Sequence, residues 1–301
     1  MTAAQIAAGA IPDRRGRDKV ATGIFASLMH AALALAFIGL GAIIYDFTSD
    51  GVKVLSWDFV SSFPSRVSPE RAGIESAIFG TLWLMAICAF IVVPVGVMTA
   101  IYLEEYADGS RWWNRMIEIN LQNLAAVPSV VYGILGLAFI VRGPIGIGPI
   151  VLAGGITLAL LVLPVVVIVA REAIRAVPAS IREGSLALGA TQWQTISKQV
   201  LPGSLAGIAT GVILALSRAI GETAPLLVIG AAVSSRFNPE WGIAGFGDSF
   251  TALPIQIFAW TQDPNPEFIS RAAGAILVLM VILVFMNSVA IWLRNRYEQK
   301  W

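Results

Sequence analysis

Apolar residues in this chain gather into six long runs that are separated by shorter polar or charged segments. Each run has about 20 residues or more, the length a helix needs to cross the ~30 Å hydrocarbon core of a bilayer. Backbone polar groups in lipid must be satisfied within their own segment, so we expect each run to be a helix. The runs cover residues 20–45, 74–103, 121–141, 150–170, 204–232 and 272–293. A seventh apolar stretch, 250–260, is too short to span and predicts a re-entrant or interfacial helix.

The composition supports the same assignment. Apolar residues make up 57% of the chain and charged residues only 13%, whereas a soluble domain carries roughly 25% charged residues. The sequence therefore predicts an all-α polytopic membrane protein with six transmembrane helices. The single cysteine, Cys88, and the single histidine, His30, exclude an intrachain disulfide and offer no metal site or cysteine–histidine catalytic pair. The net charge of +1 gives no reason to expect nucleic acid as a partner.

Lysine and arginine are distributed unevenly between the two sides of the predicted bundle. With a cytoplasmic N-terminus, the inside segments hold 13 basic residues and the outside segments 6, while Arg218 falls within the fifth run. Cytoplasmic segments of membrane proteins are enriched in these residues, so we expect both termini to be cytoplasmic, in a cell (inner or plasma) membrane protein. The predicted parts are a cytoplasmic tail (1–19), a first helix with an outside loop (20–73), a transmembrane core (74–293) with a cytoplasmic segment (171–203), and a second tail (294–301).

The cytoplasmic segment 171–203 predicts two short helices. Pro178 can open the first, because its missing N–H needs no partner at a helix start. Gly189 can end it, because glycine accepts the left-handed conformation of a helix cap. Leu201 and Pro202 are expected to stop the second helix. Such a helix pair suits docking into a groove of another protein, although a loop packed on its own bundle would also fit the pattern.

The spacing within this segment resembles the EAA signature of the permeases of ABC importers. The matching positions are Glu183, Gly184, Ser185, Gly189, Leu201 and Pro202. The chain departs from the signature at Gly184 and Ser185, where alanines are usual, and at Gln199, where an apolar residue is usual. The resemblance implies the MetI-like type I importer fold, with 171–203 as the coupling loop that sits in a cleft of an ATPase subunit. No lysine here follows a glycine and precedes serine or threonine, so there is no P-loop, and ATP hydrolysis is expected of a partner.

The fifth run contains two charged residues, Arg218 and Glu222. Arg218 lies 14 residues beyond residue 204, about 21 Å along a helix, where an arginine costs ~2.5–3.5 kcal/mol on insertion scales. Glu222 follows four residues later, on the same helical face. Gly221 and Pro225 bracket it at a weak point of the helix. The pair could be an internal ion pair that fixes packing, or an anion site in which the guanidinium fork matches phosphate geometry.

Residues 217–227, SRAIGETAPLL, resemble the phosphate-specific members of these permeases. The Ala-Pro-Leu-Leu ending and residues 251–260, TALPIQIFAW, are similar to PstA-type rather than PstC-type subunits. The resemblance implies a phosphate importer that needs no cofactor in this chain. It also implies a PstC-like second permease subunit, two PstB-like ATPases and a PstS-like phosphate-binding protein outside, with inorganic phosphate and membrane lipid as further partners. Alternatives are a permease for another oxyanion and a secondary anion transporter or channel, which would not need the coupling loop. A membrane enzyme is disfavoured, since no nucleophile–base or metal cluster is visible.

Overall fold

The computed structural model describes residues 14–65, 67–232, 237–240 and 242–297, and every regular element in these ranges is a helix. The chain divides into two compact units, residues 1–49 and 50–301. The first unit holds most of α2 (Arg14–Val54). The described side chains of α2 from residue 22 to residue 46 are exposed, although most of them are apolar. A helix with this surface requires an apolar environment, which lipid or a partner helix supplies.

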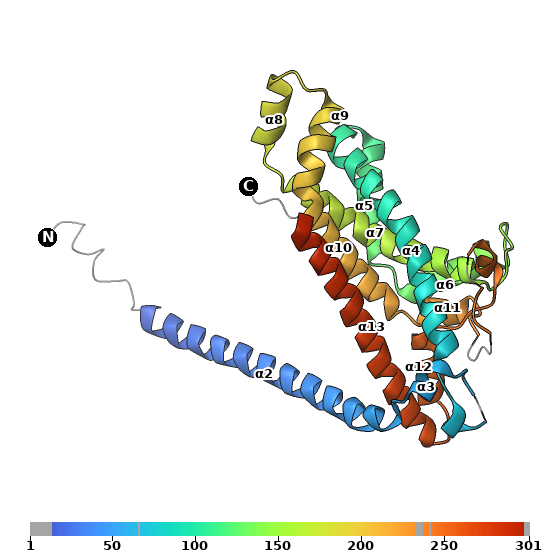
Figure 1. The fold of residues 1–301 in the computed structure, drawn as a ribbon. Helices are drawn as coiled ribbons and strands as arrows, with labels where there is room; N and C mark the ends of the chain where they lie inside the picture. Colours follow the sequence, from blue (N-terminus) through green and yellow to red (C-terminus); the bar gives the residue numbers. More distant parts are fainter. Residues whose placement is uncertain (1–13, 66, 233–236, 241, 298–301) are drawn as a thin grey trace. The chain divides into compact units, whose positions relative to one another are not determined.

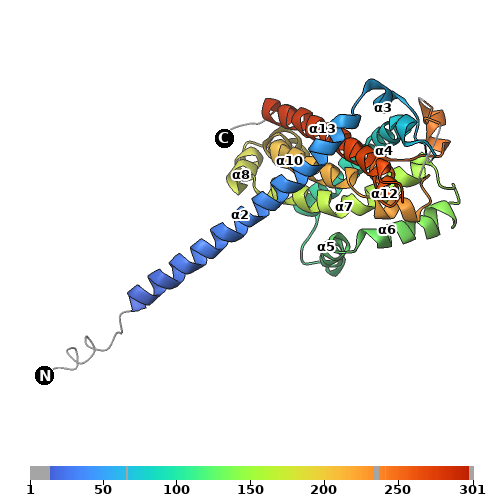
Figure 2. The same ribbon diagram turned by 90° about the horizontal axis from the view of Figure 1, so that it is seen from below.

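In the second unit, α4 and α10 pack against α7, and α13 packs against α10 (Figure 1, Figure 2). The longer helices of this unit are α4 (Glu75–Ile101), α5 (Trp112–Ala125), α7 (Val151–Arg175), α10 (Leu201–Ile220) and α13 (Glu267–Tyr297). The shorter ones are α3 (Trp57–Ser61), η1 (Pro69–Arg71), η2 (Tyr102–Tyr106), α6 (Ser129–Leu135), η3 (Gly136–Val141), α8 (Ala179–Ala187), α9 (Gln192–Thr195), η4 (Ile196–Val200), α11 (Ala224–Val228), η5 (Ile243–Gly247) and α12 (Leu253–Thr261).

Small residues allow α7 to approach its two neighbours closely. A Cβ added at Gly155 of α7 would lie 2.4 Å from Cγ2 of Ile87 on α4. A Cβ added at Gly211 of α10 would lie 2.1 Å from Cγ1 of Val169 on α7. Helices in lipid gain little from hydrophobic burial against each other, so this close contact is what holds them together.

Among the described residues, five helices are long and apolar enough to cross a membrane, and a bent pair supplies a sixth candidate. The predicted third helix, 121–141, was wrong as a single straight span. Helix α5 ends at Ala125, and the helical stretch Ser129–Val141 continues at 108° to it. Pro128 accounts for the break, because proline disfavours helical geometry at the residue before it and cannot donate a backbone hydrogen bond. The first, second, fourth and sixth predicted spans are confirmed as helices, whereas the fifth is helical without a break only as far as Ile220.

The expected short helix in 250–260 is α12, which packs against α13 and α4. Its first residue, Leu253, donates its N–H to Oγ1 of Thr81 on α4 at 2.9 Å, and both residues are buried. The side chain of Gln256 on α12 is also buried. A polar contact therefore fixes the start of α12, where backbone N–H groups have no partner within the helix.

Candidate functional site

The helix formed by the fifth apolar run is interrupted between Gly221 and Pro225, which is the weak point predicted from the sequence. Helix α10 ends at Ile220, Gly221 caps it, and α11 begins only at Ala224. Pro225 is in the first turn of α11, where its missing N–H is tolerated. The predicted span 204–232 was therefore wrong as one continuous helix, and Glu222 lies in the gap between two helices.

Arg218 and Glu222 contact each other across the end of α10. The Arg218 Nε atom donates to Oε1 of Glu222 at 3.3 Å. The Arg218 side chain is 52% exposed and that of Glu222 16%. In the described part of the chain, the two terminal guanidinium nitrogens of Arg218 have no hydrogen-bond partner. The pair predicted from its spacing thus forms, and half of the guanidinium fork is left available to another acceptor.

Neighbouring elements hold this break in place. Ser217, one residue before Arg218, donates its hydroxyl to Oδ1 of Asn287 on α13. On the other side of the break, α11 packs against α6 (Figure 1). A Cβ added at Gly133 of α6 would lie 2.7 Å from Cα of Pro225. The backbone around Glu222 is therefore anchored on both sides by contacts distant in sequence.

The segment expected to couple to an ATPase forms a compact pair of short helices, α8 and α9. Gly189 ends α8 with φ +85°, the left-handed conformation predicted for it. Ser185 on α8 and Thr195 on α9 share a hydrogen bond of 2.9 Å between their hydroxyls, so the serine at an otherwise alanine position joins the two helices. Glu183 and Gly184 on α8 are exposed. The apolar side chains exposed beside them are Leu186, Leu188 and Trp193.

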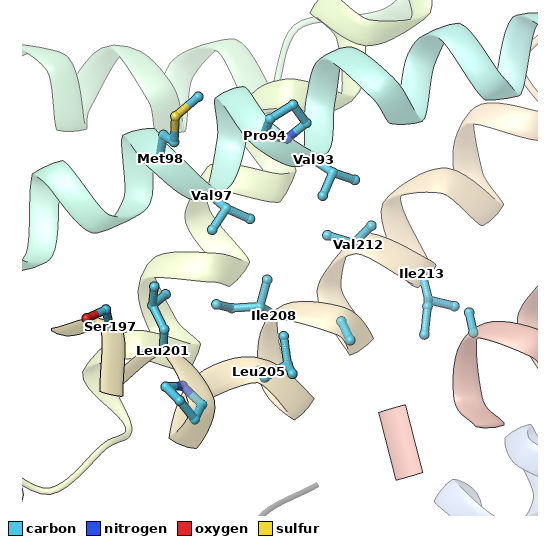
Figure 3. Close-up of a pocket in the computed structure, with 13 residues that line it drawn as sticks. Val93, Pro94, Val97, Met98, Ser197, Leu201, Leu205, Ile208, Val212 and Ile213 are labelled. Atoms are coloured by element: carbon cyan, nitrogen blue, oxygen red, sulfur yellow. The ribbon is translucent and has the colours of Figure 1, made fainter. Parts of the chain in front are cut away.

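Leu201 and Pro202 do not share this surface, and the predicted helix stop at these residues was wrong. Helix α9 continues through the π-helical stretch η4 into α10, and Pro202 falls in the first turn of α10. Both side chains line an apolar groove of about 680 Å³ between α4 and α10. Figure 3 shows Leu201 and Leu205 on the α10 side and Val93 and Val97 on the α4 side. The α7 helix also extends to Arg175, so the non-helical part of 171–203 is shorter than expected.

The sequence analysis missed a cluster of charged residues at the end of α4. Glu104 and Glu105 in η2 form ion pairs with three arginines that follow the fourth apolar run: Arg171 and Arg175 pair with Glu104, and Arg182 pairs with Glu105. A signal was available in the sequence, because two carboxylates end the second apolar run and an excess of arginines follows the fourth run, on the same predicted side. Only the fold shows which partner each carboxylate takes.

A family model described as "Binding-protein-dependent transport system inner membrane component" matches residues 92–301. This chain belongs to that family. Family membership makes it a multi-pass membrane permease of a transport system rather than an enzyme, and it implies ATPase and substrate-binding partners.

Individual relatives and solved structures agree with this membership. The chain is 33% identical to the "Probable ABC transporter permease protein YqgI" of Bacillus subtilis (strain 168), over 96% of this chain and 98% of the relative. It is 33% identical to the "Phosphate transport system permease protein PstA" of Mycobacterium leprae (strain TN), over 91% and 87% of the two chains. The fold resembles the inward-facing MetNI methionine ABC transporter, with a TM-score of 0.60 and 16% identity over 74% and 95% of the two chains. The MetI-like fold predicted from the sequence is confirmed.

Proposed function

We propose that this chain is the permease subunit of an ATP-driven phosphate importer, and that Arg218 contacts the phosphate ion during its passage. The observation that carries the proposal is the half-exposed guanidinium of Arg218, held by Glu222 through Nε alone. A planar guanidinium with free terminal N–H groups matches two oxygens of a phosphate. The similarity to proteins named phosphate permeases supports the choice of anion.

The complete importer contains four further proteins in this proposal. A PstC-like permease subunit supplies the other half of the pathway, two PstB-like subunits hydrolyse ATP, and a PstS-like binding protein delivers phosphate from outside. Both termini and the α8–α9 pair are cytoplasmic in this proposal, which the 13-to-6 asymmetry of basic residues supports. The exposed apolar side chains of that pair, together with Glu183, Gly184, Ser185 and Gly189, form the surface that docks into the ATPase. Leu201 and Pro202 belong to the same EAA signature.

Glu222 has the complementary role of releasing the ion. A lone arginine in a water-poor site would bind an anion too tightly, whereas conduction requires binding that is weak enough to reverse. The Glu222 carboxylate competes with phosphate for the guanidinium and takes it back when the ion leaves. Such competition is possible because the two side chains are paired and the Arg218 side chain is more exposed than that of Glu222, so a second acceptor can reach the guanidinium.

The test replaces Arg218 and Glu222 in turn, each by a residue that would suffice if the pair served packing alone. Arg218→Lys keeps the charge and the pairing with Glu222 but loses the planar fork. We expect phosphate uptake by the reconstituted importer to fall about tenfold or more, because the fork supplies two parallel hydrogen bonds worth ~1.5–3 kcal/mol each. Glu222→Gln removes the competitor, so phosphate release slows and turnover falls while phosphate affinity rises.

Two outcomes decide against the proposal. Normal phosphate flux in both variants would leave Arg218 and Glu222 as an internal ion pair with a packing role. Wild-type uptake of sulfate in place of phosphate would assign the permease to another oxyanion. Complex assembly and basal ATP hydrolysis serve as controls, because both should survive either substitution.

A further inference from the structure

One residue at the end of α4 contacts both helices of the coupling pair. The Glu105 side chain accepts hydrogen bonds from Nε and Nη2 of Arg182 on α8, at 3.0 and 2.8 Å. Its backbone carbonyl accepts a hydrogen bond from the side-chain amide of Gln192 on α9. Glu105 lies in η2, the π-helical end of the second apolar span. Through this residue, α8 and α9 are joined directly to a transmembrane helix.

Arg182 extends the connection to a second transmembrane helix. Its Nη1 donates to the carbonyl of Val177 at 2.6 Å, and its Nη2 donates to the carbonyl of Ile174 at 2.8 Å. Ile174 is in the last turn of α7, where the final carbonyls have no partner within the helix. One guanidinium therefore ties together the end of α4, the end of α7 and the first coupling helix.

The adjacent residue, Glu104, strengthens the same junction. It accepts from Arg171 at 2.8 Å and from Arg175 at 2.7 Å, both on α7. Arg171 also donates to Glu118 of α5 at 3.1 Å. The inner ends of α4, α5 and α7 are thus linked by ion pairs, and Glu105 attaches the coupling helices to this linked group.

Partial burial makes the loss of either partner of the Glu105–Arg182 pair costly. The two side chains are only 9% and 23% exposed, and removing one partner of a buried pair leaves an uncompensated charge. By contrast, the nearby pair of Arg175 and Glu172 is 54% and 67% exposed at 3.8 Å, and such surface pairs contribute little. None of the residues of α8 is buried. Ile181 of α8 packs, partly buried, against the apolar cluster of Ile174 and Val177, and the polar contacts of Arg182 add a second connection to the bundle.

We propose that Glu105 is the positioning residue that transmits movement of the coupling helices to α4 and α7. The inference rests on the proposed function, in which an ATPase moves α8 and α9. Force on α8 reaches α4 through the Glu105 carboxylate and α7 through the carbonyls that Arg182 holds. Without the contact, α8 moves while the transmembrane helices lag behind, and ATP hydrolysis is separated from opening of the pathway.

The experiment measures phosphate transported per ATP hydrolysed by the reconstituted complex. Glu105→Gln keeps the shape of the side chain and the carbonyl that Gln192 contacts, but loses the charge that pairs with Arg182. We expect this ratio to fall by about fivefold or more, the lower end of typical coupling factors, while the complex stays assembled and hydrolyses ATP. Glu172→Gln, which removes the exposed pair, is the matched control and should keep the wild-type ratio.

Two further variants separate transmission from a role in folding. Arg182→Lys keeps the charge but loses the fork that reaches Glu105 and the α7 carbonyls together, so the ratio should fall there even if Glu105→Gln does not assemble. Glu105→Gln combined with Arg182→Gln should be no worse than Arg182→Gln alone, because the Glu105 carboxylate acts through Arg182. An unchanged ratio of phosphate transported to ATP hydrolysed, in Glu105→Gln or in Arg182→Lys, would overturn the proposal. A proportional loss of uptake and of ATP hydrolysis counts as such a result, because it leaves the ratio unchanged.

A readout that needs no substrate distinguishes this proposal from the proposed function. A nitroxide attached at Leu188→Cys, in a Cys88→Ala background, reports the mobility of the exposed end of the coupling pair. Its mobility should rise in Glu105→Gln and stay unchanged in Glu172→Gln. A wild-type complex that hydrolyses ATP without moving phosphate would contradict the proposed function, and the nitroxide result would still decide the role of Glu105.

Discussion

Gly133→Ala tests whether the packing of α6 on α11 sets the position of Glu222. The added Cβ would lie 2.7 Å from Cα of Pro225 and 3.0 Å from both its carbonyl oxygen and Cβ of Val228. Ordinary contact begins at about 3.4 Å, so α11 must move by about 0.7 Å, the difference between 3.4 and 2.7 Å. The backbone of Pro225 cannot rotate aside as a flexible side chain would. The displacement is therefore passed to the short connection that carries Glu222.

The energetic cost can be estimated from two opposing effects. Overpacking a close helix contact costs about 1–3 kcal/mol, whereas alanine in place of glycine inside a helix gains about 1 kcal/mol. We expect a net loss of about 0–2 kcal/mol in the free energy of unfolding. Transport should respond more strongly, since a displacement near 1 Å in a positioned group can cost about 100-fold in rate.

The assay pairs phosphate uptake in proteoliposomes with unfolding in detergent. Gly39→Ala in α2 is the matched control, because nothing lies within 4 Å of a Cβ at that position and the helix-propensity gain is the same. Uptake should fall about tenfold or more in Gly133→Ala and stay near wild type in Gly39→Ala. Wild-type uptake in Gly133→Ala, at equal protein in the membrane, would refute the argument that α6 positions Glu222.

Three further predictions address the fold, the coupling surface and the orientation. Thr81→Val should lower the free energy of unfolding by about 1–3 kcal/mol, because the buried N–H of Leu253 loses its acceptor; Thr157→Val, which loses only a hydrogen bond to its own helix, should cost less. Gly189→Asp should abolish uptake and stimulation of ATP hydrolysis while leaving the protein in the membrane, because it adds an unpaired carboxylate to the apolar surface that is proposed to be buried on docking; normal stimulation in the assembled complex contradicts docking through this surface. Cysteines at Ser185 and Ser249, in a Cys88→Ala background, should label from opposite sides, and labelling of both from outside would reverse the predicted orientation.

Sequence reasoning succeeded where a feature depends on residues close together in the chain. The apolar runs, the left-handed Gly189 and the weak point between Gly221 and Pro225 follow from local length, backbone freedom and a missing N–H. Arg218 and Glu222 meet because residues four apart share a helical face.

Prediction from the sequence failed where the outcome depends on contacts between segments that are distant in the chain. Pro202 locally predicts a helix stop, yet the helix continues from α9 through the π-helical stretch η4 into α10. Pro128 lies inside a predicted membrane span, yet the helix breaks there. The helices before and after the break lie at 108° to each other, and α6 packs against α11. The side-chain partners of Glu104 and Glu105 lie 67 to 87 residues away from them in the chain, and only packing brings them together.

The break at Glu222 favours a pathway over a purely structural ion pair. Backbone that leaves the helix at membrane depth is tolerated where it is buried in protein or lines a polar cavity, and polar residues at such breaks are typical of ion sites in transporters. A pair that served packing alone could be accommodated in a continuous helix, with both side chains buried and all guanidinium donors satisfied. Here Arg218 is half-exposed, with its terminal nitrogens unpartnered in the described residues, while Glu222 is mostly covered. The carboxylate also partly neutralises the arginine, as does the negative end of the α10 dipole, so the proposed site would bind an arriving anion weakly. A conducting site requires weak, reversible binding. The helix break beside Arg218 and Glu222 is anchored by the close approach at Gly133 and by the Ser217–Asn287 contact.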